Sequence, residues 1–108
     1  MRVNYVKQKL QRGEPVFGCA AVGAPHPELA HAFAAAGFDF LLIENEHSPM
    51  SLESDQVLVR AGRAADLTVI TRVPDAEYHL VARTLDTGAE GIICPRVESP
   101  ERAAEVVS

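Results

Sequence analysis

The segment LLIENEHSPM, residues 41–50, places two carboxylates and an imidazole directly after a run of apolar residues. Charged side chains at the edge of a core need a partner or take part in chemistry. Glu44, Glu46 and His47 provide the groups of general acid–base catalysis, because a neighbouring carboxylate can fix the tautomer of the imidazole and raise its basicity. A network of salt bridges is the alternative interpretation.

Further cationic side chains occur near the ends of two later apolar runs. Arg72 lies in VITRV and Arg96 follows GIICP. A guanidinium at the end of a buried strand needs an anionic partner, which for Arg72 is Glu44, Glu46 or a substrate carboxylate. The combination of carboxylate, imidazole and guanidinium suits acid–base chemistry on an anionic substrate.

Two absent features narrow the chemistry. The only lysines, Lys7 and Lys9, lie near the N-terminus, so no strand carries a lysine that could form a Schiff base. A carbonyl substrate would therefore be activated by arginine or by a metal ion. The sequence has no glycine-rich nucleotide-binding loop. Two acids and one histidine are not a specific metal signature.

The elements that must position these residues alternate along the chain. Short apolar runs predict strands, and segments with helical spacing of apolar residues lie between them. We expect helices at 3–13, 26–37, 51–66, 75–88 and 99–107, and strands at 15–23, 38–44, 67–73 and 89–95. Ser51, Asp75 and Ser99 are the expected helix N-caps. Strands of this kind separated by helices predict an α/β fold with a parallel sheet, whose active site lies at the C-terminal ends of the strands.

The number of strand–helix units predicts about the first half of a (β/α)8 barrel of the TIM type, because a full barrel needs roughly 200–250 residues. We expect residues 1–108 to form one domain, the N-terminal half of such a barrel. Three explanations are open. The chain is part of a longer protein, two copies complete each other, or a small open sheet is closed in another way.

Composition excludes several classes of partner. The chain is 47% apolar and 23% charged and has a net charge of −5, as in ordinary globular proteins. Without a basic patch, neither nucleic acid nor an anionic membrane is an expected partner. No apolar run has the length of a membrane span, and the N-terminus lacks the apolar core of a signal peptide. We therefore expect a cytoplasmic protein. Cys19 and Cys94 are expected to be buried free thiols, and Tyr78 and Phe33 to be packing residues.

Three segments in order, AGFDFLLIENEHSPMS, VITRVPD and LDTGAEGIICPRVESPERAAEVV, resemble the HpcH/HpaI aldolase family. The resemblance covers most of the chain from about residue 16 and implies a metal-dependent class II pyruvate aldolase. Such an enzyme is a carbon–carbon lyase that reversibly cleaves a 4-hydroxy-2-oxo acid into pyruvate and an aldehyde. The resemblance also implies a homo-oligomer with these small molecules as its substrates.

The resemblance assigns roles to the matching positions. His47 matches the general base, and Arg72 matches the arginine that binds the pyruvate carbonyl oxygen and stabilises the enolate. Glu44 stands where many members have an aspartate that pairs with the histidine, which is a departure by one methylene. Glu46 matches an acid of the substrate-binding network.

The family also implies a divalent metal ion, Mg²⁺, Mn²⁺ or Co²⁺, whose carboxylate ligands lie downstream of Ser108, so none of its ligands is expected in this chain. Two alternatives to the aldolase are a truncated, non-catalytic half-barrel that acts as an assembly module, and a citrate-lyase-like enzyme that uses the same rim.

Overall fold

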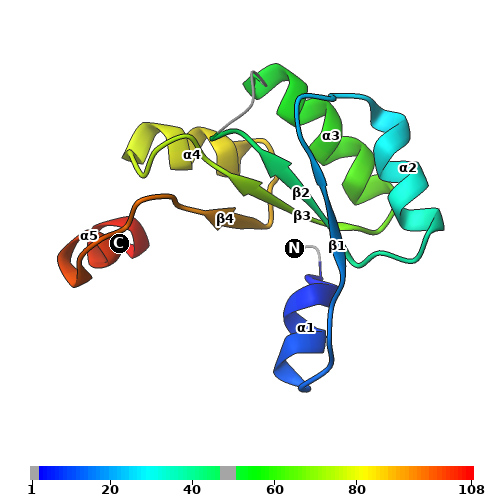
Figure 1. The fold of residues 1–108 in the computed structure, drawn as a ribbon, viewed down its shortest axis with the longest axis horizontal. Helices are drawn as coiled ribbons and strands as arrows, with labels where there is room; N and C mark the ends of the chain where they lie inside the picture. The colour runs from blue at the N-terminus through cyan, green and yellow to red at the C-terminus, as the bar shows by residue number, and fades with distance from the viewer. Residues whose placement is uncertain (1–2, 47–50) are drawn as a thin grey trace.

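The computed structural model describes residues 3–46 and 51–108. Its elements follow the expected order of helices and strands (Figure 1). The helices are α1 (Tyr5–Gln11), α2 (Pro27–Ala35), α3 (Leu52–Ala64), α4 (Tyr78–Asp86) and α5 (Pro100–Val107). The strands are β1 (Gly18–Ala21), β2 (Phe40–Glu44), β3 (Thr68–Arg72) and β4 (Gly91–Ile93). The predicted alternation is confirmed, although the strands are shorter than the apolar runs that contain them.

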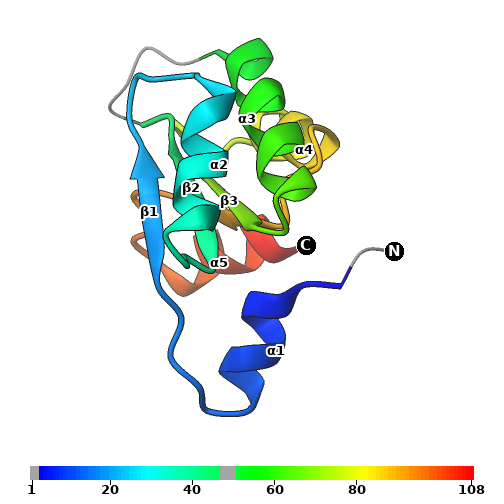
Figure 2. The ribbon, with the colours of Figure 1, turned by 90° about the vertical axis from the view of Figure 1, so that its right-hand side faces the viewer.

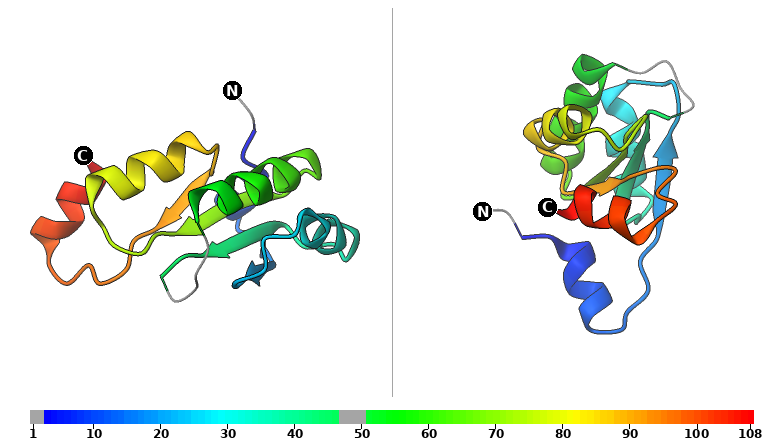
Figure 3. Two further views of the ribbon diagram at one scale, coloured as in Figure 1. Left: turned by 90° about the horizontal axis from the view of Figure 1, so that it is seen from above. Right: turned by 90° about the vertical axis from the view of Figure 1, so that its left-hand side faces the viewer.

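The sheet has the winding of a barrel. Its strand order is β1-β2-β3-β4, and each strand pairs in parallel with the next one along the chain. A helix forms each crossover, and α2, α3 and α4 lie in an arc on one side of the sheet (Figure 3). Because strand order never reverses and the helices share one side, the arrangement is that of consecutive units of a (β/α)8 barrel.

The core lies between the sheet and the helices α2 and α3. Leu41, Ile43 and Val69 project from the sheet and are 0% exposed, as are Leu58 and Val59 of α3. Burial alternates along β2 because successive strand side chains point to opposite faces. One face of the sheet therefore supplies the core.

The other face of the sheet is only half-buried. Phe40, Leu42 and Ile70 lie on it, and at its C-terminal edge so do Glu44 and Arg72. In a (β/α)8 barrel this face is the interior, which is filled by side chains from all the strands. The open face is thus the part of the fold that the remaining strands of a barrel would cover.

Local sequence signals explain most of the helix ends. The Ser51 hydroxyl accepts a hydrogen bond from the Ser54 N–H (3.2 Å), and the Ser99 hydroxyl accepts one from the Arg102 N–H (3.1 Å), so both predicted N-caps are confirmed. Asp75 was wrongly predicted to cap α4. Its Oδ1 accepts a hydrogen bond from the adjacent Ala76 N–H (2.8 Å), and α4 begins at Tyr78 with Glu77 as its N-cap residue. The Asp75 carboxylate thus accepts its hydrogen bond from a backbone N–H that precedes the helix, and it does not cap the first turn of α4.

Two further expectations need correction. Tyr78 is 87% exposed and does not pack, whereas Phe33 packs against the core as predicted. Cys19 and Cys94 are free thiols, but both are half-buried rather than buried. They lie at positions where the sheet or the turn after it is incompletely covered. Among the described residues, no helix combines the length and apolar character that crossing a membrane requires.

Gly62 marks the closest approach of α3 to the sheet. A Cβ at this position would lie 2.6 Å from Val69 Cγ2 and 3.6 Å from Leu41 Cδ2. Because both neighbours belong to the packed core, we expect Gly62→Val to lower the free energy of unfolding by about 1–3 kcal/mol. Urea titration measures the change. Ala64→Val is the matched control on the exposed side of α3. An equal effect of the two substitutions would contradict the close packing.

Helix α1 lies beyond the N-terminal ends of the strands, away from the C-terminal edge that carries Glu44 and Arg72 (Figure 2). The Lys9 ammonium contacts Asp39 Oδ1 at 2.6 Å, and the Phe17 N–H donates to Asp39 Oδ2 at 3.0 Å. The hydrogen bond from Lys9, and then the one from Phe17, lower the pKa of Asp39. Asp39 therefore connects α1, the segment before β1 and the start of β2.

We expect Asp39→Asn to lower the melting temperature at pH 7. A lowered folded-state pKa stabilises the fold above the unfolded pKa of about 4, and this stabilisation is lost as the pH falls through the folded-state value. The difference between the variant and the wild type should therefore disappear on acidification, which melting curves from pH 7 to pH 3 test. Glu14→Gln, in the exposed Arg12–Glu14 pair, serves as control. A difference that persists unchanged at pH 3 would contradict the ion-pair explanation.

Candidate active site

The register of β2 and β3 brings together two of the residues singled out in the sequence. Glu44 is paired with Arg72 at the C-terminal ends of these strands. The Asn45 N–H continues the ladder by donating to the Arg72 carbonyl oxygen at 3.0 Å. Since paired residues of parallel strands project to the same side, both side chains emerge on the open face, at the edge where a barrel carries its active site.

The Arg72 guanidinium lies between two carboxylates. Nη1 donates to Glu44 Oε2 at 3.3 Å, and Nη2 donates to Glu46 Oε1. The Glu46 N–H also donates to Glu44 Oε1 at 2.6 Å, so the two acids are tied to each other through the backbone. The expectation that Arg72 needs an anionic partner is confirmed, and both of the candidate acids serve. Their catalytic and substrate-binding roles remain predictions.

This cluster retains capacity to bind a ligand. A guanidinium has five N–H donors, and the two carboxylates engage both Nη atoms without using all of their hydrogens. The Arg72 side chain is 34% exposed, whereas those of Glu44 and Glu46 are 12% and 9% exposed. The carboxylates thus fix the position of a cation that is itself accessible. Such a fixed cation can stabilise negative charge on the oxygen of an anionic ligand.

His47, the predicted general base, lies outside the described residues. The residue before it, Glu46, is held through both its backbone N–H and its side chain. The predicted pairing of the imidazole with Glu44 therefore stays a prediction.

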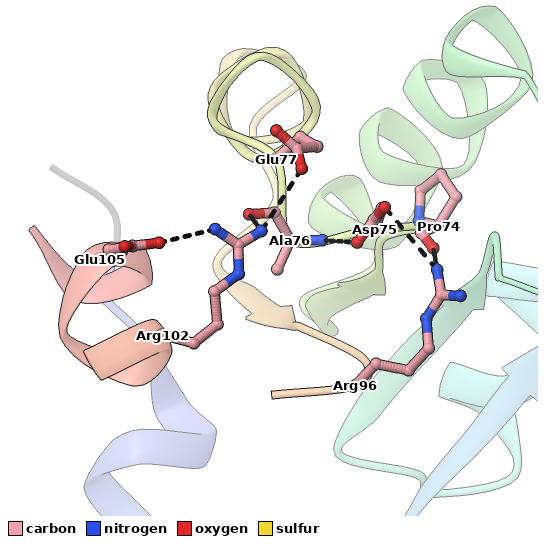
Figure 4. A network of polar contacts seen from close by, with 7 residues as sticks. All are labelled: Pro74, Asp75, Ala76, Glu77, Arg96, Arg102 and Glu105. Carbon is pink, nitrogen blue, oxygen red and sulfur yellow. Dashed lines mark hydrogen bonds and ion pairs between the residues drawn. The ribbon is translucent and has the colours of Figure 1, made fainter. Parts of the chain in front are cut away.

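A second polar network connects the segments that follow β3 and β4 (Figure 4). Arg96 donates to the Pro74 carbonyl oxygen at 3.3 Å and lies 3.8 Å from Asp75 Oδ2. Arg102 donates to the Ala76 carbonyl oxygen at 2.8 Å and forms ion pairs with Glu77 and Glu105. Arg96 thus lies at the same edge as Arg72, as predicted. Its side chain is 65% exposed, and it ties the loops of this edge together.

One functional candidate was missed in the sequence. Asp55, in the first turn of α3, is 0% exposed, and its Oδ2 accepts a hydrogen bond from the Asn45 side-chain amide. The signal was present in the spacing, because Asp55 precedes the buried Leu58, Val59 and Gly62 by three, four and seven positions. A carboxylic acid on the buried stripe of a helix indicates a specific partner.

The described residues do not form a metal site. No three histidine, cysteine, aspartate or glutamate side chains of residues 3–46 and 51–108 lie close enough together to hold an ion. Glu44 and Glu46 are the acids at the edge of the sheet that could act as metal ligands, but both bind the Arg72 guanidinium. A cation in that position competes with a metal ion for the same oxygen atoms.

The fold and the position of the Arg72 cluster define the class: about half of a (β/α)8 barrel with polar residues at the C-terminal edge of its sheet. The family model "HpcH/HpaI aldolase/citrate lyase" matches residues 21–108. The chain therefore belongs to the HpcH/HpaI aldolase/citrate lyase family, and the predicted family and fold are confirmed.

Individual relatives agree with this assignment. The chain is 38% identical over 105 residues to a hydroxypyruvate/pyruvate aldolase of Roseobacter denitrificans, an alignment that covers 97% of this chain and 41% of the relative. It is 35% identical over 107 residues to a 4-hydroxy-2-oxovalerate aldolase of Novosphingobium aromaticivorans, covering 98% and 40%. The crystal structure of an HpcH/HpaI aldolase from Desulfitobacterium hafniense superposes with a TM-score of 0.88 at 32% identity, covering 94% and 39%. The chain thus spans about two fifths of the length of the relatives it matches.

Proposed function

We propose that this chain contributes the N-terminal half of the active site of a pyruvate aldolase, a carbon–carbon lyase that reversibly cleaves a 4-hydroxy-2-oxo acid into pyruvate and an aldehyde. The observation that carries the proposal is the Arg72 guanidinium, held by Glu44 and Glu46 at the C-terminal end of β3 and still partly exposed. Membership of the family and the names of the aldolase relatives support it.

In the proposed reaction, His47 removes the proton from the C4 hydroxyl of the substrate. The C3–C4 bond then breaks, C4 becomes the aldehyde carbonyl, and the electron pair moves through C3 and C2 to the C2 oxygen. Arg72 stabilises the negative charge on that oxygen, since it is a fixed cation that needs no reorganisation when the charge develops. A proton returned to C3 gives pyruvate, and the reverse sequence forms the aldol.

The acids have supporting roles in this proposal. Glu44 holds both Arg72 and His47, and Glu46 orients Arg72 toward the substrate carboxylate and carbonyl. A divalent ion, Mg²⁺, Mn²⁺ or Co²⁺, would act as a Lewis acid on the 2-oxo acid. The described residues do not fit such an ion, so its ligands would come from outside them.

The direct test is a pyruvate-release assay with 4-hydroxy-2-oxovalerate on the purified protein that contains this chain together with the rest of the barrel, in the presence of Mg²⁺, Mn²⁺ or Co²⁺ in turn. The proposal expects pyruvate to form with at least one of these ions, and the same protein to consume pyruvate when an aldehyde is supplied. A folded protein that releases no pyruvate with any of the three ions would contradict it.

A non-catalytic assembly module is the second candidate, and the open face of the sheet favours it. Leu42 and Ile70 are half-buried there, and Ile93, at the end of β4, is 42% exposed. An apolar sheet face of this kind is covered in a stable protein, either by further strands or by another copy. In both candidates we propose a cytoplasmic homo-oligomer. A mass measurement in solution, combined with the release assay, separates a catalytic oligomer from an inactive one.

A further inference from the structure

Asp55 is a carboxyl group buried inside the fold but placed directly behind the Arg72 cluster. It is 0% exposed, and its partner Asn45 stands between Glu44 and Glu46 in the chain. The Asn45 backbone N–H donates to the Arg72 carbonyl oxygen at 3.0 Å. Asn45 therefore connects α3 to the end of β3, and its two neighbours in the chain, Glu44 and Glu46, are the acids that contact Arg72.

The pairing of Asn45 and Asp55 leaves two oxygen atoms unused. Asn45 Nδ2 donates to Asp55 Oδ2, while Asn45 Oδ1 and Asp55 Oδ1 are both buried without a hydrogen-bond partner. An ionised carboxylate and an amide oxygen are both acceptors, so neither can satisfy the other. Two buried acceptors without partners are costly, and a buried carboxylate without a cation is more costly still.

A single proton on Asp55 would give both oxygen atoms a hydrogen bond and remove the buried charge. When Asp55 is protonated, its hydroxyl can donate to Asn45 Oδ1 while its carbonyl oxygen accepts from Asn45 Nδ2. The two groups then form a closed pair with two hydrogen bonds and no buried charge.

We propose that Asp55 is protonated in the folded protein and that, through this two-bond pair with Asn45, it is a positioning residue for the Arg72 cluster. The pair holds the segment of Glu44 and Glu46 against α3, so that both carboxylates meet the Arg72 guanidinium. The positioning role rests on the proposed aldolase function. The protonation of Asp55 does not.

The surroundings of Asp55 are consistent with a neutral group. Burial raises the pKa of Asp55, and the hydrogen bond from Asn45 opposes this only in part. Ionisable side chains on the elements packed around α3 are either exposed or on the open face of the sheet. They are His26, Glu28 and His31 of α2 and its N-cap, Glu53, Arg60 and Arg63 of α3, Tyr78, His79, Arg83 and Asp86 of α4, and Glu44 and Arg72 of the sheet. The exception is Cys19 of β1, which is half-buried and lies in register with the core residue Leu41.

Asp55→Asn tests the protonation, because an amide can form the same two hydrogen bonds with Asn45 but cannot ionise. The raised pKa of Asp55 in the folded state stabilises the wild type fully below the unfolded pKa of about 4, and this stabilisation is lost as the pH rises through the folded-state value. The wild type should therefore lose stability relative to the variant as the pH rises from 4, by up to tenfold in the unfolding equilibrium constant per pH unit.

Urea titrations of both proteins between pH 4 and pH 8 measure this difference. A difference independent of pH, or one in which the wild type gains on the variant as the pH rises, would overturn the protonation, since an ionised and hydrated Asp55 predicts the latter. A ¹³C NMR titration of the wild-type Asp55 carboxyl, assigned by its loss in Asp55→Asn, gives a second readout that does not depend on unfolding.

The positioning role has its own readout in the pyruvate-release assay. We expect Asp55→Ala and Asn45→Ala to lower kcat by about tenfold or more, because small displacements of fixed groups are costly in catalysis, and we expect Asp55→Asn to restore it to within about twofold of the wild type. Unchanged kcat in both alanine variants, or no rescue by asparagine, would overturn this role. If the wild type itself releases no pyruvate, the proposed function fails, and the pH dependence still decides the state of Asp55.

Discussion

Arg72→Met is expected to lower kcat/KM for pyruvate release by about 10²–10³-fold, the usual effect of removing one donor that stabilises a developing oxyanion. The substitution keeps an unbranched side chain but removes the cation that Glu44 and Glu46 hold at the edge of the sheet. The effect should fall mainly on kcat, because the negative charge on the substrate oxygen is largest in the transition state.

The same substitution removes the guanidinium that contacts both carboxylates, so it also changes the stability of this edge of the sheet. Melting curves of Arg72→Met must therefore accompany the kinetics, with the exposed Arg60→Met of α3 as control. A folded Arg72→Met protein with wild-type kcat/KM would show that Arg72 is only a structural ion-pair residue.

His47→Ala is expected to reduce pyruvate release by about 10²–10⁴-fold, the range for loss of a general base. The reason is chemical, since cleavage of the C3–C4 bond requires removal of the proton from the C4 hydroxyl. Glu46, the residue before His47, is fixed by its contacts with Glu44 and Arg72.

The exposed histidines of α2 and α4 provide matched controls. His31→Ala and His79→Ala should leave the rate within about twofold, because surface substitutions away from a site have small effects. Equal rates in all three histidine variants would assign the base to another residue.

The fold was predictable because each strand is a continuous apolar run and each helix has its own boundary signals. Ser51 and Ser99 cap helices as their types predict, and Gly37 and Gly88 follow helices with φ of 91° and 102°, a conformation that favours glycine. The start of α4 was not predictable from residue type alone, since Asp75 satisfies its carboxylate on the next N–H and postpones the helix.

The site was predictable where it depended on strand ends and not where it depended on packing. The Arg72–Glu44 contact follows from parallel register, which places residues at strand ends side by side. The Asp55–Asn45 pair depends on which face of α3 meets the sheet, and an aspartate near a helix start is usually a solvated residue that favours the helix dipole. Tyr78 shows the reverse error. An aromatic residue in a helical segment was expected to pack, but its side chain is exposed.

The role of Arg72 in forming the enolate can be measured by the exchange of the methyl protons of pyruvate with deuterium, followed by ¹H NMR in D₂O with Mg²⁺, Mn²⁺ or Co²⁺. This half-reaction forms the enolate without needing the identity of the aldehyde. We expect the wild-type protein to catalyse the exchange and Arg72→Met to lower its rate by about 10²-fold or more, as for the loss of an oxyanion donor. Exchange at the same rate in the wild type and in Arg72→Met, or no exchange by a folded wild type with any of these ions, would contradict this role.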